Sequence, residues 1–206
     1  ATYPPSAPAT PSYSVYGFWE SANLNPVHQL DIFAYYQISR QKIFSDKPQL
    51  DRFTFGINHF GNFNSFSTIF EGAYQFGKMA DFDISAYLLS LQGDYTFSNG
   101  KIGLGADILS GGEAGTGIKV FDPGFGTNHK FYGYMDYFIN IPGNTFNHGL
   151  NDLYASFTYK PVDCNWEGSL NIHHFMAHES FKYGVLYVQN GVIINEVSES
   201  STFGQE

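Results

Sequence analysis

The sequence predicts an all-β fold: an antiparallel transmembrane β-barrel, or a partial chain of one, with about ten strands and one long loop. Segments of about ten residues alternate apolar and polar side chains, as where Leu153, Ala155 and Phe157 alternate with polar residues. A period of two places the two sets on opposite faces of a strand. The apolar runs are only a few residues long, whereas a membrane-crossing helix needs about 20. Strands with one apolar and one polar face are typical of a barrel with lipid outside and water inside.

Composition agrees with this prediction. The chain has 206 residues, enough to bury one core or close one barrel, and 18% of them are aromatic while 14% are charged. Aromatic side chains belong where a barrel wall meets the two membrane interfaces. The net charge of −9 excludes a nucleic-acid partner, which needs a basic surface. A soluble β-sandwich, jelly roll or lipocalin-like carrier with an aromatic core remains the alternative fold.

The elements follow in order. Residues 1–12, rich in Pro, Ser and Thr, are expected to form an extended N-terminal segment, and residues 13–206 the barrel portion. Strands are predicted at 13–20, 27–39, 51–60, 66–76, 82–97, 101–109, 151–160 and 165–177, with weaker signals at 131–139 and 184–196. Asn99-Gly100 and Asn190-Gly191 are tight-hairpin signals. Short turns are set against longer loops at 40–50 and 110–150, an asymmetry typical of outer-membrane barrels.

The segment 82–97 changes its apolar phase. Its apolar residues fall on even positions up to Leu88 and on odd positions from Leu91 onward. One explanation is a β-bulge near Leu88–Ser90, with Asp83, Ser85 and Tyr87 facing the interior of the barrel. The alternative is that the strand extends beyond the membrane and changes its environment.

The polar phase of the strands gives the residues expected to line the lumen. The candidates for solute passage are Asp31, Arg52, Glu71, Gln75, Asp83, Asp107, Asp152, Lys160 and Glu167. Acids outnumber bases in this set, and a lumen of that sign favours cations. The alternative is that the charges pair across neighbouring strands and leave little net field.

The segment 110–150 is too long and too aromatic for a plain connection. Its candidate constriction residues are Phe121, Asp122, Phe125, His129, Lys130, Tyr132, Tyr134 and Asp136. Three interpretations are open: a loop folded into the mouth as a constriction, a saccharide-binding platform of stacked rings, or packing against the barrel wall or a partner.

The same segment carries a resemblance. Gly111-Gly112-Glu113 followed by the run from Phe121 to Phe138, FDPGFGTNHKFYGYMDYF, resembles the long-loop signature of the alginate-export family of outer-membrane barrels. The segments 71–77, 83–87 and 149–154 are similar to neighbouring strands of that family, and 203–206 looks like the start of a further strand. The resemblance covers residues 27–206 and corresponds to the C-terminal half of a member.

The resemblance implies an outer-membrane porin or export channel of a Gram-negative bacterium, in contact with outer-membrane lipid and lipopolysaccharide. The family's best-known activity is export of an acidic polysaccharide, which calls for a basic constriction. Because the predicted lumen is acidic, we expect passive passage of other hydrophilic solutes or saccharides. The alternative function is a non-conducting barrel that scaffolds an envelope protein assembly.

Other chemistry finds little support in the sequence. Gly112–Lys119 resembles a phosphate loop, but no Ser or Thr follows its lysine. His173 and His174 are neighbours on a predicted strand and face opposite ways, which disfavours a metal site. Cys164 is a lone cysteine, so no internal disulfide is expected. We therefore expect no enzyme activity, no cofactor and no metal.

Overall fold

The computed structural model describes residues 13–40, 49–112, 117–124, 132–135, 137–163, 165–189 and 192–205, with only the backbone described at 185–189 and 192–196. The all-β prediction is confirmed. Within these described residues the strands are β1 (Tyr13–Asn23), β2 (His28–Ser39), β3 (Leu50–Phe63), β4 (Phe66–Met79), β5 (Phe82–Phe97), β6 (Gly100–Leu109), β7 (Leu150–Tyr159), β8 (Gly168–Gln189) and β9 (Val192–Gln205), and α1 (Ile141–Asn144) is a short helix.

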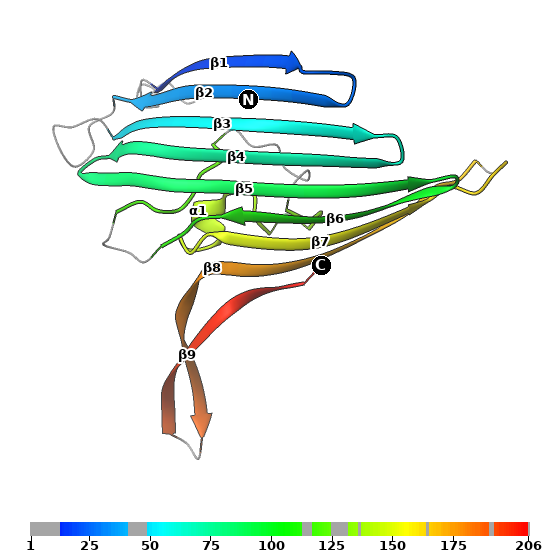
Figure 1. The fold of residues 1–206 in the computed structure, drawn as a ribbon. Coiled ribbons are helices and arrows are strands. Elements are labelled where there is room, and N and C mark those ends of the chain that lie inside the picture. The colour runs from blue at the N-terminus through cyan, green and yellow to red at the C-terminus, as the bar shows by residue number, and fades with distance from the viewer. Residues whose placement is uncertain are drawn as a thin grey trace, which may run out of the picture.

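The strands form one antiparallel sheet in which each pairs with its neighbours in the chain (Figure 1). Within the described residues β1 and β9 each pair on one side, so the sheet is not closed. Because the strands alternate in direction, the connections after β2, β4 and β6 lie at one end, here called the long-loop end. The two long loops expected from the sequence therefore share an end. The opposite, short-turn end carries the connections after β1, β3, β5 and β7.

The bulge predicted in β5 is wrong. Pairing of β5 with β4 and with β6 continues without a shift in register. Ile84, Ala86 and Leu88 therefore share a face with the polar residues Ser90, Gln92 and Asp94. The sequence changes polarity along one face of β5 because the first part lies under the 110–149 loop and the second part does not.

The weak strand signals need a second correction. No strand occurs at 132–135 or 137–139, where turns lead into α1, whose N-cap Asn140 accepts a hydrogen bond from the backbone N–H of Gly143. The predicted strands 165–177 and 184–196 are instead a single long β8 followed by β9. The pairing of β8 with β9 shifts register between Phe175 and Phe181 and then continues, so β8 remains one strand. The hairpin signal at 190–191 lies outside the described residues.

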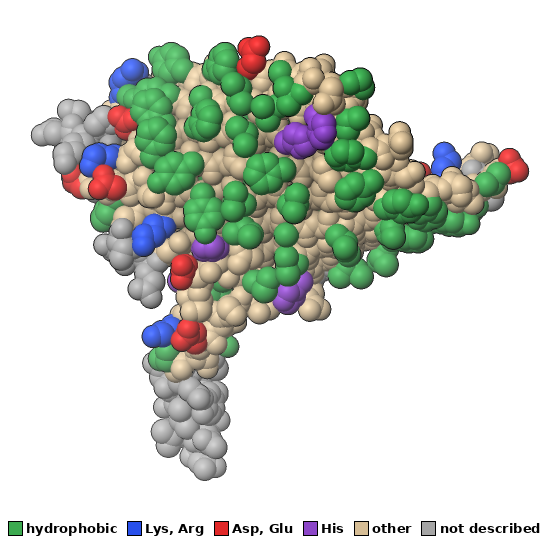
Figure 2. All heavy atoms as spheres, viewed as in Figure 1, with side chains coloured by type: hydrophobic (Ala, Val, Ile, Leu, Met, Phe, Trp, Pro, Cys, Tyr) green, Lys and Arg blue, Asp and Glu red, His purple; other side chains and the backbone are tan. Residues whose placement is uncertain are grey.

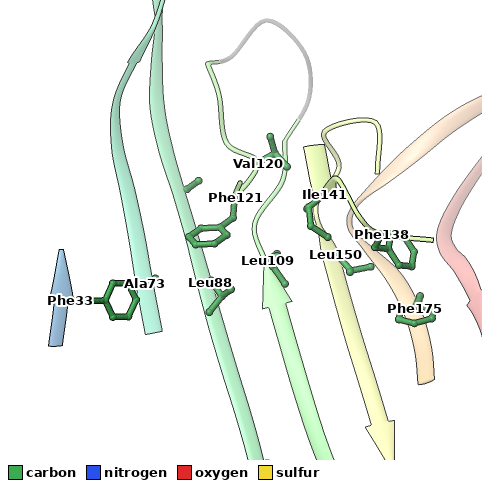
Figure 3. Packing of buried hydrophobic residues seen from close by; sticks show 11 residues of the cluster. Phe33, Ala73, Leu88, Leu109, Val120, Phe121, Phe138, Ile141, Leu150 and Phe175 are labelled. Carbon is green, nitrogen blue, oxygen red and sulfur yellow. The ribbon is translucent and has the colours of Figure 1, made fainter. Parts of the chain in front are cut away.

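The core lies on one face of the sheet, here called the inner face. A row of apolar residues crosses it in register, one per strand from β2 to β7: Phe33, Gly56, Ala73, Leu88, Leu109 and Leu150. The described parts of the 110–149 loop fold over this row and pack Val120, Phe121, Phe138 and Ile141 into the same cluster (Figure 3). Burying a ring such as Phe121 stabilises this arrangement by roughly 2 kcal/mol. In the described part of the chain, no helix has the length and apolar character to cross a membrane.

Candidate functional site

The outer face of the sheet carries two rows of aromatic side chains. Near the long-loop end Tyr16, Tyr36, Phe53 and Phe76 pair in register across β1–β4. The Tyr36 and Phe53 rings stack with centroids 4.3 Å apart, and those of Phe53 and Phe76 stack at 5.4 Å. We call this set the loop-end row. The turn-end row, near the other end of the strands, consists of Phe63, Phe66, Tyr95 and Phe157.

Between the two rows the outer face is apolar. Phe55, Leu89, Leu91 and Leu104 are each 44–70% exposed there. In the described strands β2–β8, the outer positions between the rows hold no Asp, Glu, Lys or Arg. Figure 2 shows hydrophobic side chains over this face and most acidic and basic ones at its margins. A monomer in water rarely exposes a continuous apolar surface of this extent.

Between the two aromatic rows, the charged side chains of the same strands lie on the inner face. One register row, here called the acidic row, lies beside the apolar row and crosses six strands: Asp31, Asn58, Glu71, Ser90, Asp107 and Asp152. Asp31, Asp107 and Asp152 are buried, with at most 6% of each residue exposed. The alternation that places apolar side chains on the outer face thus brings four carboxylates into one row.

The acidic row has hydrogen-bond partners at both of its ends. At its β7 end Asp152 Oδ2 lies 2.8 Å from Nδ1 of His173 on β8. At its β2 end Asp31 accepts a hydrogen bond from Gln29 Nε2 at 2.9 Å. The loop also reaches this row: burial raises the pKa of the Tyr132 phenol, and the carboxylates of Asp107, Glu71 and Asp152 raise it further.

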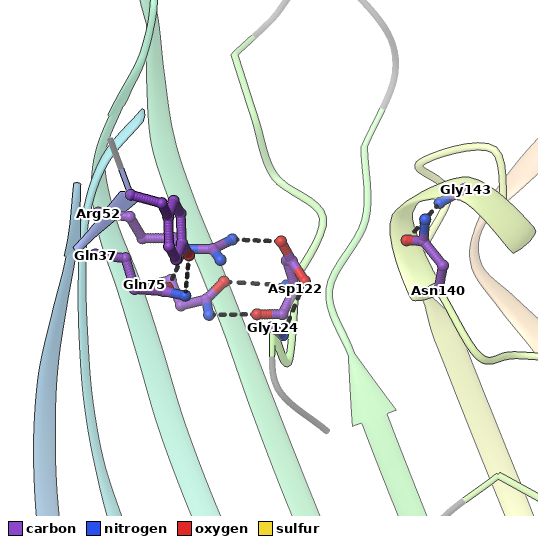
Figure 4. Close-up of polar contacts among 8 residues, drawn as sticks. Gln37, Arg52, Gln75, Asp122, Gly124, Asn140 and Gly143 are labelled. Carbon is purple, nitrogen blue, oxygen red and sulfur yellow. Dashed lines mark hydrogen bonds and ion pairs between the residues drawn. The ribbon is translucent and has the colours of Figure 1, made fainter. Parts of the chain in front are cut away.

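A second polar group fixes the loop to the opposite part of the wall. Arg52 of β3, almost fully buried, donates from Nη1 to Asp122 Oδ2 at 2.8 Å and from Nε to Gln37 Oε1 at 2.8 Å. Gln75 of β4 donates to the backbone carbonyl of Asp122 and accepts from its backbone N–H. Asp122 Oδ1 also accepts from the N–H of Gly124. We call Arg52, Gln37, Gln75 and Asp122 the latch (Figure 4).

The loop segment that carries Asp122 also forms backbone hydrogen bonds with β5. β6 ends at Leu109, so residues 82–87 of β5 have no strand beside them on that side. The loop occupies this place: Ile118 accepts from the N–H of Ser85 and donates to the carbonyl of Asp83, at 2.9 and 2.8 Å. The segment 117–124 therefore starts at β5 and reaches β3 and β4 across the inner face, so that Phe121 enters the core and Asp122 the latch.

Several predicted lumen residues come together on the inner face. The acidic row holds Asp31, Glu71, Asp107 and Asp152, and the latch holds Arg52 and Gln75 together with the loop residue Asp122.

Other predicted site residues lie elsewhere. The inner face predicted for Asp83, Ser85 and Tyr87 is wrong, because burial alternates along β5 in the opposite phase. Asp83 is exposed and binds Lys78 at 2.7 Å beyond the loop-end row. Lys160 and Glu167 are exposed at the short-turn end, and Tyr134 is 66% exposed. Phe125, His129, Lys130, Asp136 and Cys164 lie outside the described residues.

Sequence reasoning missed two inner-face contacts between neighbouring strands. Lys101 Nζ lies 3.0 Å from Asp94 Oδ2. Tyr154 lies flat over Gly105, where an added Cβ would be 2.1 Å from the ring. The pairing of Gly105 with Tyr154 across β6 and β7 is the signal that could have found this contact, because a large ring often covers a glycine on the neighbouring strand.

Comparisons of this chain with family models, with curated proteins and with solved structures find no match. The function is therefore argued from the geometry of the two faces.

Proposed function

We propose that this sheet is part of the wall of an outer-membrane β-barrel of a Gram-negative bacterium, a porin-like channel through which hydrophilic solutes or saccharides pass passively. The observation that carries the proposal is the separation of charge between the faces. Between the aromatic rows of β2–β8 the described outer positions are uncharged, while the same strands present five carboxylates, an arginine and a lysine on the inner face.

The spacing of the aromatic rows supports a membrane on the outer face. Ten residues separate Phe53 from Phe63 along β3 (63 − 53), and ten separate Phe66 from Phe76 along β4 (76 − 66). At about 3.3 Å per residue and a tilt of about 40°, ten residues rise about 25 Å along a barrel axis. This height equals the apolar band of outer-membrane barrels, whose aromatic girdles lie at its two edges.

The inner face supports solute passage past a constriction. The latch holds the loop segment 117–124 against the wall near the long-loop end, where it would narrow the lumen. Below it the acidic row gives the lumen a negative field, which attracts cations and repels anions. This sign disfavours export of an acidic polysaccharide, although the loop from Phe121 to Phe138 resembles that of the alginate-export family.

A non-conducting barrel that scaffolds an envelope assembly is the second candidate. It is favoured by the depth of the loop packing, since Phe121, Phe138 and Ile141 are 0–8% exposed within one core cluster. Single-channel recording of the full chain with its native envelope partners distinguishes the two. A steady conductance supports the channel, and its absence in a folded, membrane-inserted protein supports the scaffold.

The membrane proposal is tested with one matched pair of substitutions. Leu104 and Val162 are both exposed, by 70% and 67%, but Leu104 lies between the aromatic rows and Val162 in the turn after β7. In a bilayer Leu104→Arg should destabilise the protein by about 2–4 kcal/mol, and Val162→Arg by less than about 1 kcal/mol. Both are measured by denaturant unfolding from lipid vesicles. Equal and small effects of the two substitutions would refute a lipid-facing outer face.

A further inference from the structure

Trp19 stands on the inner face of β1 with one side of its ring uncovered. It pairs with Phe33 of β2, and the two rings stack with centroids 5.1 Å apart and planes 9° from parallel. Trp19 is 57% exposed, whereas Phe33 is 6% exposed. An apolar ring of this size that remains open on the polar face of a sheet calls for an explanation.

Phe33 also contacts the neighbouring strand. The Phe33 ring lies over Gly56 of β3, where an added Cβ would be 2.2 Å from Phe33 Cζ. Phe33 therefore contacts both Gly56 and the Trp19 ring, and it is 6% exposed. Phe33 stacks on the Trp19 ring, yet 57% of Trp19 stays exposed. Trp19 Nε1 donates to Ser21 Oγ at 3.1 Å, which helps to orient the ring.

Polar groups adjoin the open ring. Ser21 pairs across the strands with Asp31, the first member of the acidic row. Asp31 accepts one hydrogen bond from Gln29 Nε2, through Oδ1. Asn23 and Gln29 form the next pair along the same two strands. A flat apolar surface therefore borders a line of hydroxyl, carboxylate and amide groups.

We propose that Trp19 is a stacking platform for a pyranose ring of a saccharide that is neutral or carries amino groups. This inference rests on the proposed function and names the class of solute that the lumen binds. The C–H groups on one face of a pyranose carry partial positive charge and match the negative face of the indole ring. Its hydroxyl or ammonium groups find acceptors in the exposed Ser21 and Asn23 and the half-buried Gln29, whereas a uronic acid meets the negative charge of the neighbouring Asp31.

The test uses the fact that the chain has two tryptophans, Trp19 and Trp166. In the full chain carrying Trp166→Phe, Trp19 is the sole indole reporter. Its fluorescence in detergent micelles is titrated with cellotriose, with the trimer of glucosamine and with trigalacturonate. We expect a saturable change with cellotriose and the glucosamine trimer, and at least tenfold weaker binding of trigalacturonate at low salt.

Calorimetry on Trp19→Ala and Trp19→Phe in the otherwise unchanged chain shows whether the ring itself binds. Trp19→Ala should weaken cellotriose binding at least tenfold, and Trp19→Phe should weaken it less. Trp166→Ala is the matched control, because Trp166 is also 57% exposed but lies in the turn before β8. Unchanged strand content by circular dichroism identifies the variants that fold.

The proposal is overturned if cellotriose leaves Trp19 fluorescence unchanged, if trigalacturonate binds as tightly, or if folded Trp19→Ala binds like the parent chain. Conductance separates these failures from failure of the channel. Saccharide binding that depends on Trp19 in a protein without conductance supports the platform and refutes the channel. A conducting protein in which Trp19→Ala changes no saccharide binding supports the channel and refutes the platform.

Discussion

Removal of the Asp122 carboxylate should free the loop segment 117–124 from the wall. Asp122→Ala deletes both side-chain bonds of the latch on the loop side, the one to Arg52 Nη1 at 2.8 Å and the one to the Gly124 N–H at 2.9 Å. The backbone bonds between Asp122 and Gln75 remain, so the loop still has a reference position from which opening can be measured.

The magnitude follows from the two lost contacts. A hydrogen bond between charged groups contributes about 1.5–3 kcal/mol, and the lower end applies because the Asp122 side chain is 34% exposed. The bond to the Gly124 N–H adds about 1 kcal/mol. The sum of about 2.5 kcal/mol corresponds to a roughly 50- to 100-fold change in the opening equilibrium. It is a lower bound, because the substitution leaves Arg52, 4% exposed, without its counter-charge.

Hydrogen–deuterium exchange of the peptide spanning 117–124 measures this change. The backbone N–H groups of Phe121 and Asp122, which donate to Ser110 and Gln75, should exchange 50- to 100-fold faster in Asp122→Ala. The isosteric Asp122→Asn should give an intermediate increase. Lys78→Met is the matched control: its ion pair with Asp83 is 2.7 Å long but both side chains are exposed. Exchange in Asp122→Ala within threefold of the parent would refute the latch.

Three further outcomes are expected. Gly56→Ala should lower stability by about 1–3 kcal/mol in thermal unfolding, because the new Cβ would lie 2.2 Å from the ring above it; an unchanged midpoint would contradict the stack. Asp152→Ala and His173→Ala should each lower the free energy of unfolding in urea by about 3 kcal/mol, and the double variant should lower it by much less than the sum of the two. Additive losses would show that the 2.8 Å contact contributes nothing to stability. Glu71→Gln should reduce the cation preference that the reversal potential in a salt gradient measures. Asp83→Asn is the control and should leave this preference unchanged, because Asp83 is exposed at the long-loop end. Anion preference in the parent protein would contradict the acidic lumen.

The strand elements were largely predictable because alternation is a local property. Eight strong strand signals each correspond to a strand of the structure. The boundaries of seven differ by at most three residues, because pairing extends a strand beyond its apolar core, whereas β8 continues to Gln189, well past the predicted end at 177. The face of most lumen candidates was also predictable, since one residue of known orientation fixes all others at a period of two. The prediction failed in β5, where apolar Ile84, Ala86 and Leu88 face inward. A loop that packs on the wall reverses the usual relation between polarity and face.

The candidate site was predictable only in its composition. An excess of acids on the polar phase was visible in the sequence, but their alignment in one row depends on the register of six strands. The latch joins residues 70 positions apart, and no local pattern links Arg52 with Asp122. Trp19 was unremarkable in the sequence because its stacking depends on the glycine two strands away.

By itself the sequence determined the all-β class, the positions of most strands, the long loops and the sign of the charge on the polar phase. These follow from residue types within a few positions of each other, where the period of two and the turn residues act directly. Only the tertiary structure decided that the loop folds over the inner face, that Arg52 and Gln75 hold it through Asp122, and that one ring of the Trp19 stack stays open. Those contacts join distant segments, and they form because pairing of the whole sheet sets which side chains face one another.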